Sequence, residues 1–302
     1  MLNLKKKINV KDDTGKWLSD NLRLRVENNH LIYESSVIRK PKISSHTLID
    51  LVGLNKYSSP GKTVLSMFGL LEKTPIEKYQ TYKGGISEIF AKEYLRKKYN
   101  GQADIESFTV SQFPDFNQFP EAAPFSGVLD LMMHKPLKMS VEVKSKEMRE
   151  YERIAEHGIF PRDQVAQGAN QAVLAGTTRY MMLWVFLKPR ASKLLKELSA
   201  VHTYERTVEE NGVLTKVTAE EDSWIWGEDF GRAAAELGLK DTDFKYFAKE
   251  FDVDIRLVNA YREKALKLYN EFLINRRVER KLFSTKELKS ISDFIKTDKR
   301  PE

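Results

Sequence analysis

Two apolar segments near the middle of the chain each contain an acidic residue, and this feature restricts the fold more than any other. The segments are FSGVLDLMM (125–133) and MSVEVK (139–144), joined by the polar stretch HKPLK. In the second segment the valines face one way and Glu142 and Lys144 the other, because side chains alternate along a strand. We therefore predict a β-hairpin over residues 125–144 that holds Asp130 and Glu142 on adjacent strands.

The acidic residues of this hairpin need a physical reason. Asp and Glu are depleted in strands, and an unpaired carboxylate is costly to bury. Two carboxylates on adjacent strands also repel each other unless a cation lies between them. A divalent metal ion bound by oxygen ligands would supply that cation. The alternative is a buried ion pair between Lys144 and Asp130. Two further E-x-K sequences, both after residue 278, lie in polar helical sequence and are interpreted as solvated charges.

A predicted helix after Gly84 and Gly85 offers a third carboxylate. Its apolar face is formed at helical spacing by Ile86, Ile89, Phe90 and Tyr94. Glu88 stands at the margin of this face, where its carboxylate could reach the sheet and add a metal ligand. The alternative is an ordinary solvated glutamate.

A second predicted helix follows Pro161 and carries a stripe of amides. Gln164, Gln167 and Gln171 share one face of it, among small residues. An amide can hold a water molecule or a phosphate oxygen without adding charge. Solvated glutamines are the alternative.

The composition favours a soluble protein that binds a polyanion. The chain has 302 residues, a net charge of +7 and a pI near 9.2, which favours nucleic acid as a partner. The alternative is a merely basic soluble protein. Cysteine is absent, so disulfides and thiolate metal sites are excluded, and the five histidines lack zinc-ligand spacing. No apolar run approaches the ~20 residues that span a bilayer, and the basic N-terminus lacks the apolar stretch of a signal peptide. We expect a cytoplasmic protein without a membrane partner.

The order of elements predicts the fold class. Helix, strand, strand, helix and strand (Tyr180–Leu187) indicate an α/β (α+β) core, with a central mixed sheet flanked by helices. We divide the chain into an N-terminal segment (1–36), a core (37–215) and an α-helical C-terminal extension (216–302). Helices are expected in the extension at 227–239, 241–251 and 254–283.

These residues in this order resemble a known family. Glu88, Asp130, Glu142-x-Lys144 and a glutamine-bearing helix resemble the PD-(D/E)XK nuclease superfamily, and more narrowly its phage lambda exonuclease and YqaJ-type viral recombinase group. The segments similar to that group's motifs are KISSHTLIDLVGLNKYSSPGKTVL (42–65), KGGISEIFAKEY (83–94) and QGANQAVLAGTTRYMMLWV (167–185). The resemblance covers about residues 39–187. It departs from the usual pattern at Leu129, where the superfamily often has proline, and at His46, where the group often has a small residue.

The resemblance implies a restriction-endonuclease-like core and a function. The chain is expected to be a Mg²⁺-dependent exonuclease, with Mn²⁺ as a substitute, that hydrolyses duplex DNA from an end in phage-type recombination or DNA degradation. It implies DNA, a single-strand annealing protein and further copies of the chain as partners, in the cytoplasm of a bacterial host. The implied metal ligands are Glu88, Asp130, Glu142 and the carbonyl of Val143. The implied roles of the others are Lys144 to orient or deprotonate water, Gln167 to position Lys144 or that water, and Arg39 and Ser45 to hold a terminal phosphate.

Three other functions stay open on the sequence. One is an endonuclease of restriction or junction-resolving type, against which the end anchor Arg39 argues. Another is a non-catalytic nucleic-acid-binding module, although carboxylates hinder DNA binding unless a metal neutralises them. The third is a structural protein with the C-terminal helices as its interface.

Overall fold

A computed structural model of the chain describes residues 2–11, 16–37, 40–72, 77–200, 225 and 229–297, and the backbone of 202–210 and 213–221. In the chain order, the helices are α1 (Ser45–Leu51), α2 (Pro60–Met67), α3 (Lys78–Lys98), α4 (Arg162–Leu174), α5 (Pro189–Leu198), α6 (Asp229–Glu236), α7 (Ile255–Asn275) and α8 (Thr285–Thr297). The strands are β1 (Lys7–Lys11), β2 (Trp17–Asn21), β3 (Arg23–Glu27), β4 (His30–Glu34), β5 (Ile43–Ser44), β6 (Asp104–Ser107), β7 (Phe125–Ser126), β8 (Leu131–Lys135), β9 (Met139–Glu147), β10 (Arg179–Leu187), β11 (His202–Glu210), β12 (Val213–Glu221), β13 (Phe244–Asp252) and β14 (Arg277–Glu279).

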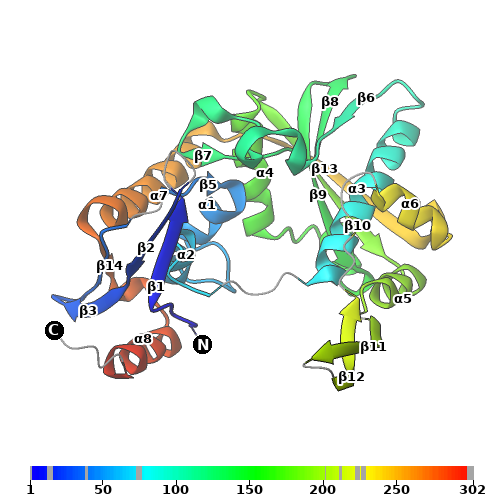
Figure 1. Cartoon of the computed structure of the whole chain (residues 1–302). Coiled ribbons are helices and arrows are strands. Elements are labelled where there is room, and N and C mark those ends of the chain that lie inside the picture. The colour runs from blue at the N-terminus through cyan, green and yellow to red at the C-terminus, as the bar shows by residue number, and fades with distance from the viewer. Residues whose placement is uncertain are drawn as a thin grey trace.

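The elements form two lobes with α4 between them (Figure 1). In the first lobe, α1, α2, α7 and α8 pack with the N-terminal strands around one apolar core that includes Leu31, Leu48, Phe68 and Phe272. The second lobe is built on a five-stranded sheet of order β13-β10-β9-β8-β6. β9 and β10 are parallel and the other neighbours antiparallel, so the sheet is mixed. The fold is therefore the mixed α/β arrangement that the order of elements predicted.

Helices cover both faces of the sheet. Residues of α3, α5 and α6 share an apolar cluster with Val141 and Val143. On the other face α4 contacts β9 and β10, with Trp184 at the centre of a separate cluster. The valines and the charged residues of β9 thus point to opposite faces, as the alternation predicted. No helix in the described part of the chain is long and apolar enough to cross a membrane.

Several predicted elements are confirmed, one of them in part. The hairpin is present as β8 and β9, paired with Leu131 opposite Val141, but its first strand begins at Leu131. Asp130 therefore precedes the strand, and β7 pairs with β5 instead of β9. The strand at Tyr180–Leu187 is present as β10, and the helix after Pro161 is α4.

The structure also shows how α1 begins. Ser44 caps this helix, because its hydroxyl accepts a hydrogen bond from the Thr47 N–H.

The expected helix over 241–251 is wrong, because residues 244–252 form β13. This strand pairs antiparallel with all of β10, from Arg179 opposite Asp252 to Leu187 opposite Phe244. Its aromatic side chains alternate between the two faces of the sheet, where Phe244 and Phe247 join different clusters. The local preference for a helix is overridden here, because these residues pair with the backbone N–H and C=O groups of the buried strand β10, which would otherwise be an unpaired edge of the sheet.

The helix that carries Glu88 starts earlier than predicted. α3 begins at Lys78, so Gly84 and Gly85 lie inside it and do not precede it. A Cβ on Gly85 would stand 2.3 Å from the ring of Phe230 on α6. The glycine therefore permits the close approach of two helices, a role that its sequence neighbourhood does not reveal.

Candidate active site

The hairpin of β8 and β9 places Asp130 next to the strand that carries Glu142. The ladder between the two strands ends at Leu131, and just beyond it Oδ2 of Asp130 accepts a hydrogen bond from the Val143 N–H at 2.8 Å. The N–H and C=O of one strand residue point to the same edge, so the Val143 carbonyl also faces Asp130. Carboxylate and carbonyl oxygens thus meet at the end of the β8–β9 ladder.

Lys144 pairs with Glu142 and not with Asp130, in contrast to the alternative considered from the sequence. Its Nζ lies 2.6 Å from Oε1 of Glu142. The Glu142 side chain is only 1% exposed, and its Oε2 has no hydrogen-bond partner among the described residues. A buried carboxylate oxygen without a hydrogen bond is costly. Glu142 therefore has one oxygen paired with Lys144 and a second that the described part of the protein leaves unsatisfied.

The charges of three acids and one amine in this region act on one another; the groups are Glu88, Asp130, Glu142 and Lys144. Burial and repulsion from Glu142 and Glu88 raise the pKa of Asp130 well above its usual value. Burial and repulsion from Glu142 raise the pKa of Glu88 to about 7. Burial lowers the pKa of Lys144, but attraction by Glu142 and Asp130 outweighs burial, so this pKa is raised. Glu88 is thus partly buried and repelled by the other acids, unlike a solvated glutamate of the helix surface.

The donor set fits a hard divalent cation in kind. Mg²⁺ takes carboxylate and carbonyl oxygens, and a cation would relieve the mutual repulsion of the acids and give the Oε2 atom of Glu142 a partner. Within the described residues, however, no three His, Cys, Asp or Glu side chains stand close enough together to form a ready-made metal cage. Lys144 and the Val143 N–H hold Glu142 and Asp130 in this arrangement.

α4 brings the amide stripe against the sheet. A Cβ on Gly168 would stand 2.7 Å from Sδ of Met182, the residue opposite Glu142 on β10. Gln167, the neighbour of Gly168, therefore lies near the position of Glu142 along the sheet. It is partly buried, and its amide makes no hydrogen bond to the residues that the structure describes. Gln164 accepts a hydrogen bond from the Trp184 indole N–H at 3.0 Å. Trp184 is opposite Lys144 in the same ladder.

The two residues expected to hold a terminal phosphate have different outcomes. Arg39 lies outside the described residues. Ser45 is 3% exposed, and its hydroxyl accepts a hydrogen bond from the Asn170 side chain at 2.9 Å. This burial argues against a direct phosphate contact by Ser45, because its oxygen is enclosed between α1 and α4.

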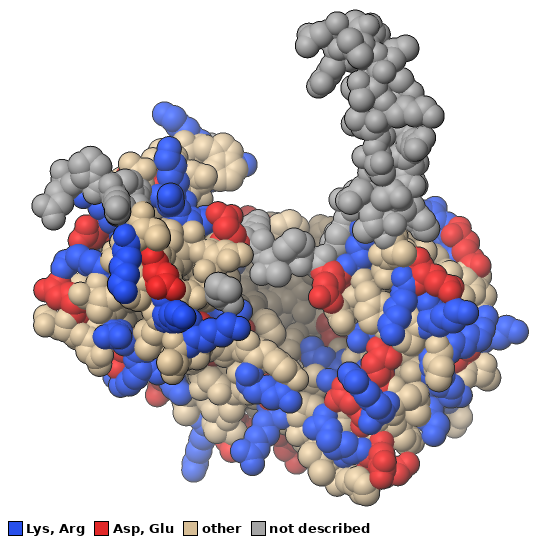
Figure 2. All heavy atoms as spheres, turned by 90° about the horizontal axis from the view of Figure 1, so that it is seen from below, with Lys and Arg blue, Asp and Glu red and all other residues tan. Residues whose placement is uncertain are grey.

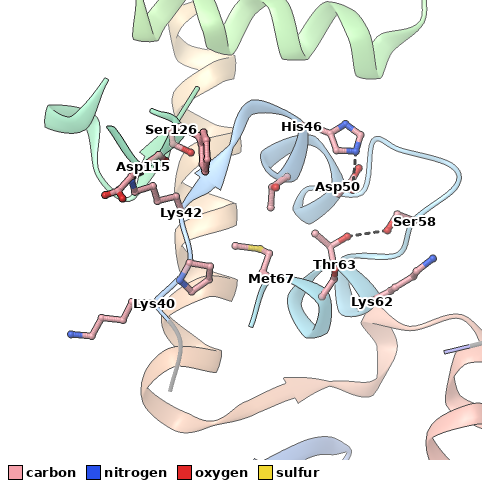
Figure 3. Close-up of a pocket in the computed structure, with 14 residues that line it drawn as sticks. Lys40, Lys42, His46, Asp50, Ser58, Lys62, Thr63, Met67, Asp115 and Ser126 are labelled. Carbon is pink, nitrogen blue, oxygen red and sulfur yellow. Dashed lines mark hydrogen bonds and ion pairs between the residues drawn. The ribbon is translucent and has the colours of Figure 1, made fainter. Parts of the chain in front are cut away.

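A cavity of about 760 Å³ lies between α1, α2 and the end of β7 (Figure 3). Lys40 and Lys62 stand on opposite sides of it, and neither has an ion-pair partner in the described part of the chain. The other charged groups of the wall are paired. Lys42 Nζ lies 3.4 Å from Oδ2 of Asp115, and Nε2 of His46 lies 3.6 Å from Oδ2 of Asp50. The two free ammonium groups make this cavity suitable for an anion.

Lys146 was missed as a functional candidate. It follows Lys144 at the same spacing that separates Lys144 from Glu142, and its side chain is only 16% exposed. The alternation in VEVKSK was the available signal, since it places all three charges on one face.

Comparison with known proteins adds one solved structure. No family model matches the sequence, and no curated protein is significantly similar to it. The crystal structure of an alkaline exonuclease from Laribacter hongkongensis is similar, with a TM-score of 0.46 and 11% sequence identity, over 84% of this chain and 94% of that chain. At this level the two chains share an outline only, so the function is inferred below from the side chains of this chain.

Proposed function

We propose that this protein is a metal-dependent nuclease that hydrolyses phosphodiester bonds of duplex DNA from an end. The observation that carries the proposal is the cluster of three mutually repelling acids around Glu142, whose buried carboxylate is paired with Lys144 through Oε1 and has no hydrogen-bond partner at Oε2 among the described residues. Strongly perturbed carboxylates with a specific charged partner are typical of catalytic sites. The net charge of +7 agrees with a polyanionic substrate.

Each residue of the cluster has a role in this proposal. Glu88, Asp130, Glu142 and the Val143 carbonyl would hold one or two Mg²⁺ ions, which Mn²⁺ could replace. Bound there, such ions supply Lewis-acid stabilisation of the attacking and leaving oxygens of the phosphate.

Lys144 would orient the attacking water and stabilise charge on the phosphate. Its raised pKa makes it an ammonium group in the metal-free protein, so it is a hydrogen-bond donor there and not a base. Lys144 could act as the base only if the attraction of the carboxylates, which raises its pKa, were first removed. Gln167, whose amide is uncommitted, would position Lys144 or the water.

The end-directed mode rests on the resemblance together with the cavity of Figure 3. Arg39 is the proposed anchor for a terminal phosphate, and the free ammonium groups of Lys40 and Lys62 lie in the wall of the adjacent cavity. A single-strand annealing protein and further copies of the chain are proposed partners on the resemblance alone. An endonuclease of the same superfamily is the competing proposal, because it would use the same acid cluster.

The test is digestion of end-labelled linear duplex DNA with and without Mg²⁺. We expect hydrolysis by the wild type only with the metal, and a loss of at least about 100-fold in Asp130→Asn and in Lys144→Ala, as is usual when a group acting on the transition state is removed. Asp104→Asn is the matched control, because Asp104 is an exposed aspartate on β6 of the same sheet. DNA binding should persist in Lys144→Ala, since only interactions of the transition state are removed.

Two results would contradict the proposal. Equal hydrolysis by Asp130→Asn and the wild type would remove the acid cluster from the chemistry. Cleavage of covalently closed circles as fast as linear DNA would exclude the end-directed mode and leave the endonuclease. A protein that binds DNA but releases no nucleotides at any Mg²⁺ concentration would be a binding module.

A further inference from the structure

A second polar hollow opens at the far end of β9. It has a volume of about 940 Å³ and lies where the parallel strands β9 and β10 both end, between α3 and α5. Ligands of open α/β sheets commonly bind outside the carboxyl ends of such strands. The location therefore suits a ligand, and the residues that line the hollow do not include the acid cluster.

The floor of the hollow is a fixed polar network. Lys83 is only 8% exposed, and its Nζ lies 3.7 Å from Oε1 of Glu147. The hydroxyls of Tyr79 and Ser192 donate hydrogen bonds to the same carboxylate, at 2.7 and 3.1 Å. The ammonium groups of Lys83 and Lys196 lie 5.3 and 5.7 Å from the centre of the Tyr79 ring. Glu147 is thus satisfied by its neighbours and holds Lys83 in place.

The rim of the hollow has an excess of positive charge. Five cationic side chains line it, against the three carboxylates of Glu147, Glu150 and Glu197; the cations are Lys83, Lys146, Arg149, Lys193 and Lys196. Arg149 is exposed and Lys196 stacks on Tyr79, and neither has an ion-pair partner among residues the structure describes. In the view from below, Lys and Arg side chains are spread over the surface of both lobes (Figure 2). Arg149 and Lys196 can bind an anion without first breaking an ion pair.

Lys146 connects this hollow to the acid cluster. It lines the hollow, and it also lies two residues after Lys144 on β9, so both side chains point to the same face. A strand advances about 3.3 Å per residue, which places Lys146 about 7 Å beyond Lys144 on the same face. Nucleic acid advances about 3.4 Å per nucleotide along a duplex strand, so about two nucleotides cover this distance.

We propose that this hollow, through Lys83, Lys146, Arg149 and Lys196, binds the phosphate backbone of the DNA strand that the acid cluster cleaves, a few nucleotides from the point of hydrolysis. The inference rests on the proposed function. It concerns the backbone and not the bases, because the Tyr79 ring is covered by two ammonium groups and so is not open for base stacking. Contacts of this kind bind without regard to sequence, as an enzyme that moves along DNA requires.

The test measures the salt dependence of binding in EDTA, where no hydrolysis occurs. The probe is a fluorescein-labelled single strand of about 12 nucleotides, followed by anisotropy. Arg149→Ala/Lys196→Ala should lower the slope of log K against log salt by about 1.4, because each lost phosphate contact on a single strand contributes about 0.7. The affinity near 0.1 M salt should fall about tenfold. Arg256→Ala/Lys289→Ala is the matched control, since it removes two exposed cations of α7 and α8 in the first lobe and should leave the slope unchanged.

The outcomes separate this inference from the proposed function. Equal slopes for the hollow variant and the wild type would overturn the strand site, even where Mg²⁺-dependent hydrolysis is intact. Displacement of the probe by about a hundredfold excess of a mononucleotide would also overturn it. The ligand would then be a free phosphate monoester, because a strand that binds through several linked phosphates should bind much more tightly than a single phosphate. A lowered slope in a protein that hydrolyses no DNA would support the strand site and contradict the nuclease.

Discussion

At Glu88 a carboxyl group on α3 faces two other acids and one amine, and this single residue shows how the site depends on pH. Its pKa is raised from 4.5 to about 7, first by burial and then by Glu142. In the folded protein the carboxyl group therefore binds its proton more tightly than in the unfolded chain. The free energy of unfolding consequently falls as pH rises from about 4.5 to about 7, because ionisation of Glu88 is easier in the unfolded state.

We predict that Glu88→Gln makes the metal-free protein more stable at pH 8, by at most about 3 kcal/mol, and flattens the fall in stability between pH 4.5 and 7. The amide keeps the shape and removes the charge that burial opposes. Urea unfolding in EDTA at several pH values measures this. Glu93→Gln, an exposed residue of the same helix, is the control. Parallel pH profiles for Glu88→Gln and the wild type would show that Glu88 does not face the other acids.

Among the elements, α4 decides how the amide stripe meets the sheet. Gly168 lets this helix lie against Tyr180 and Met182, whose atoms a Cβ would approach to 2.9 and 2.7 Å. The contact also determines where Gln167 stands, because both residues belong to the same turn. The position of the helix therefore depends on one missing methyl group.

We predict that Gly168→Ala destabilises the protein by about 1–3 kcal/mol, as overpacking of a close contact usually does. It should also lower the rate of hydrolysis, because α4 must move and Gln167 moves with it. Gly84→Ala on α3 is the matched control: a Cβ there has no atom within 4 Å, so the change should be neutral or stabilise by about 0.5–1 kcal/mol. Urea unfolding measures both variants. A Gly168→Ala protein as stable as Gly84→Ala would mean that α4 does not pack this closely.

In the molecule as a whole, a chain of hydrogen bonds holds α4, the helix between the lobes, to the first lobe. Arg262 of α7 donates a hydrogen bond from Nε to Oδ1 of Asn170 on α4, at 2.8 Å. Nδ2 of Asn170 then donates to the Ser45 hydroxyl of α1 at 2.9 Å, and Asn170 itself is 1% exposed. The guanidinium of Arg262 also lies 5.0 Å from the centre of the Phe125 ring. Residues far apart in the sequence are thus held around one amide.

We predict that Asn170→Ala lowers the free energy of unfolding by about 2–4 kcal/mol, because it leaves the buried Ser45 hydroxyl and the partly buried Arg262 guanidinium without their hydrogen bonds. Asn259→Ala, at an exposed position of α7, should change it by less than about 0.5 kcal/mol. Thermal and urea unfolding of the two variants check this. An equal effect of both changes would show that the amide does not hold α4 to the first lobe.

The sequence by itself determined the hairpin, the faces of its residues and the fold class. Alternation in MSVEVK and the apolar run of β10 are local patterns, and local patterns follow from side-chain periodicity and backbone preference. It also identified Asp130, Glu142 and Lys144 as a group, because charges inside apolar strands need a cause that neighbouring residues alone do not offer. The domain boundaries and the role of Arg39 stay predictions.

Only the tertiary structure decided which charges meet. Lys144 pairs with Glu142, Ser45 is enclosed by Asn170, and residues 244–252 become a strand because the edge of β10 requires a partner. The hollow beyond Lys146 likewise joins α3, β9 and α5. Each of these depends on contacts between segments distant in the chain, and the energy of such contacts is fixed by packing and burial, which the local order of residues does not encode.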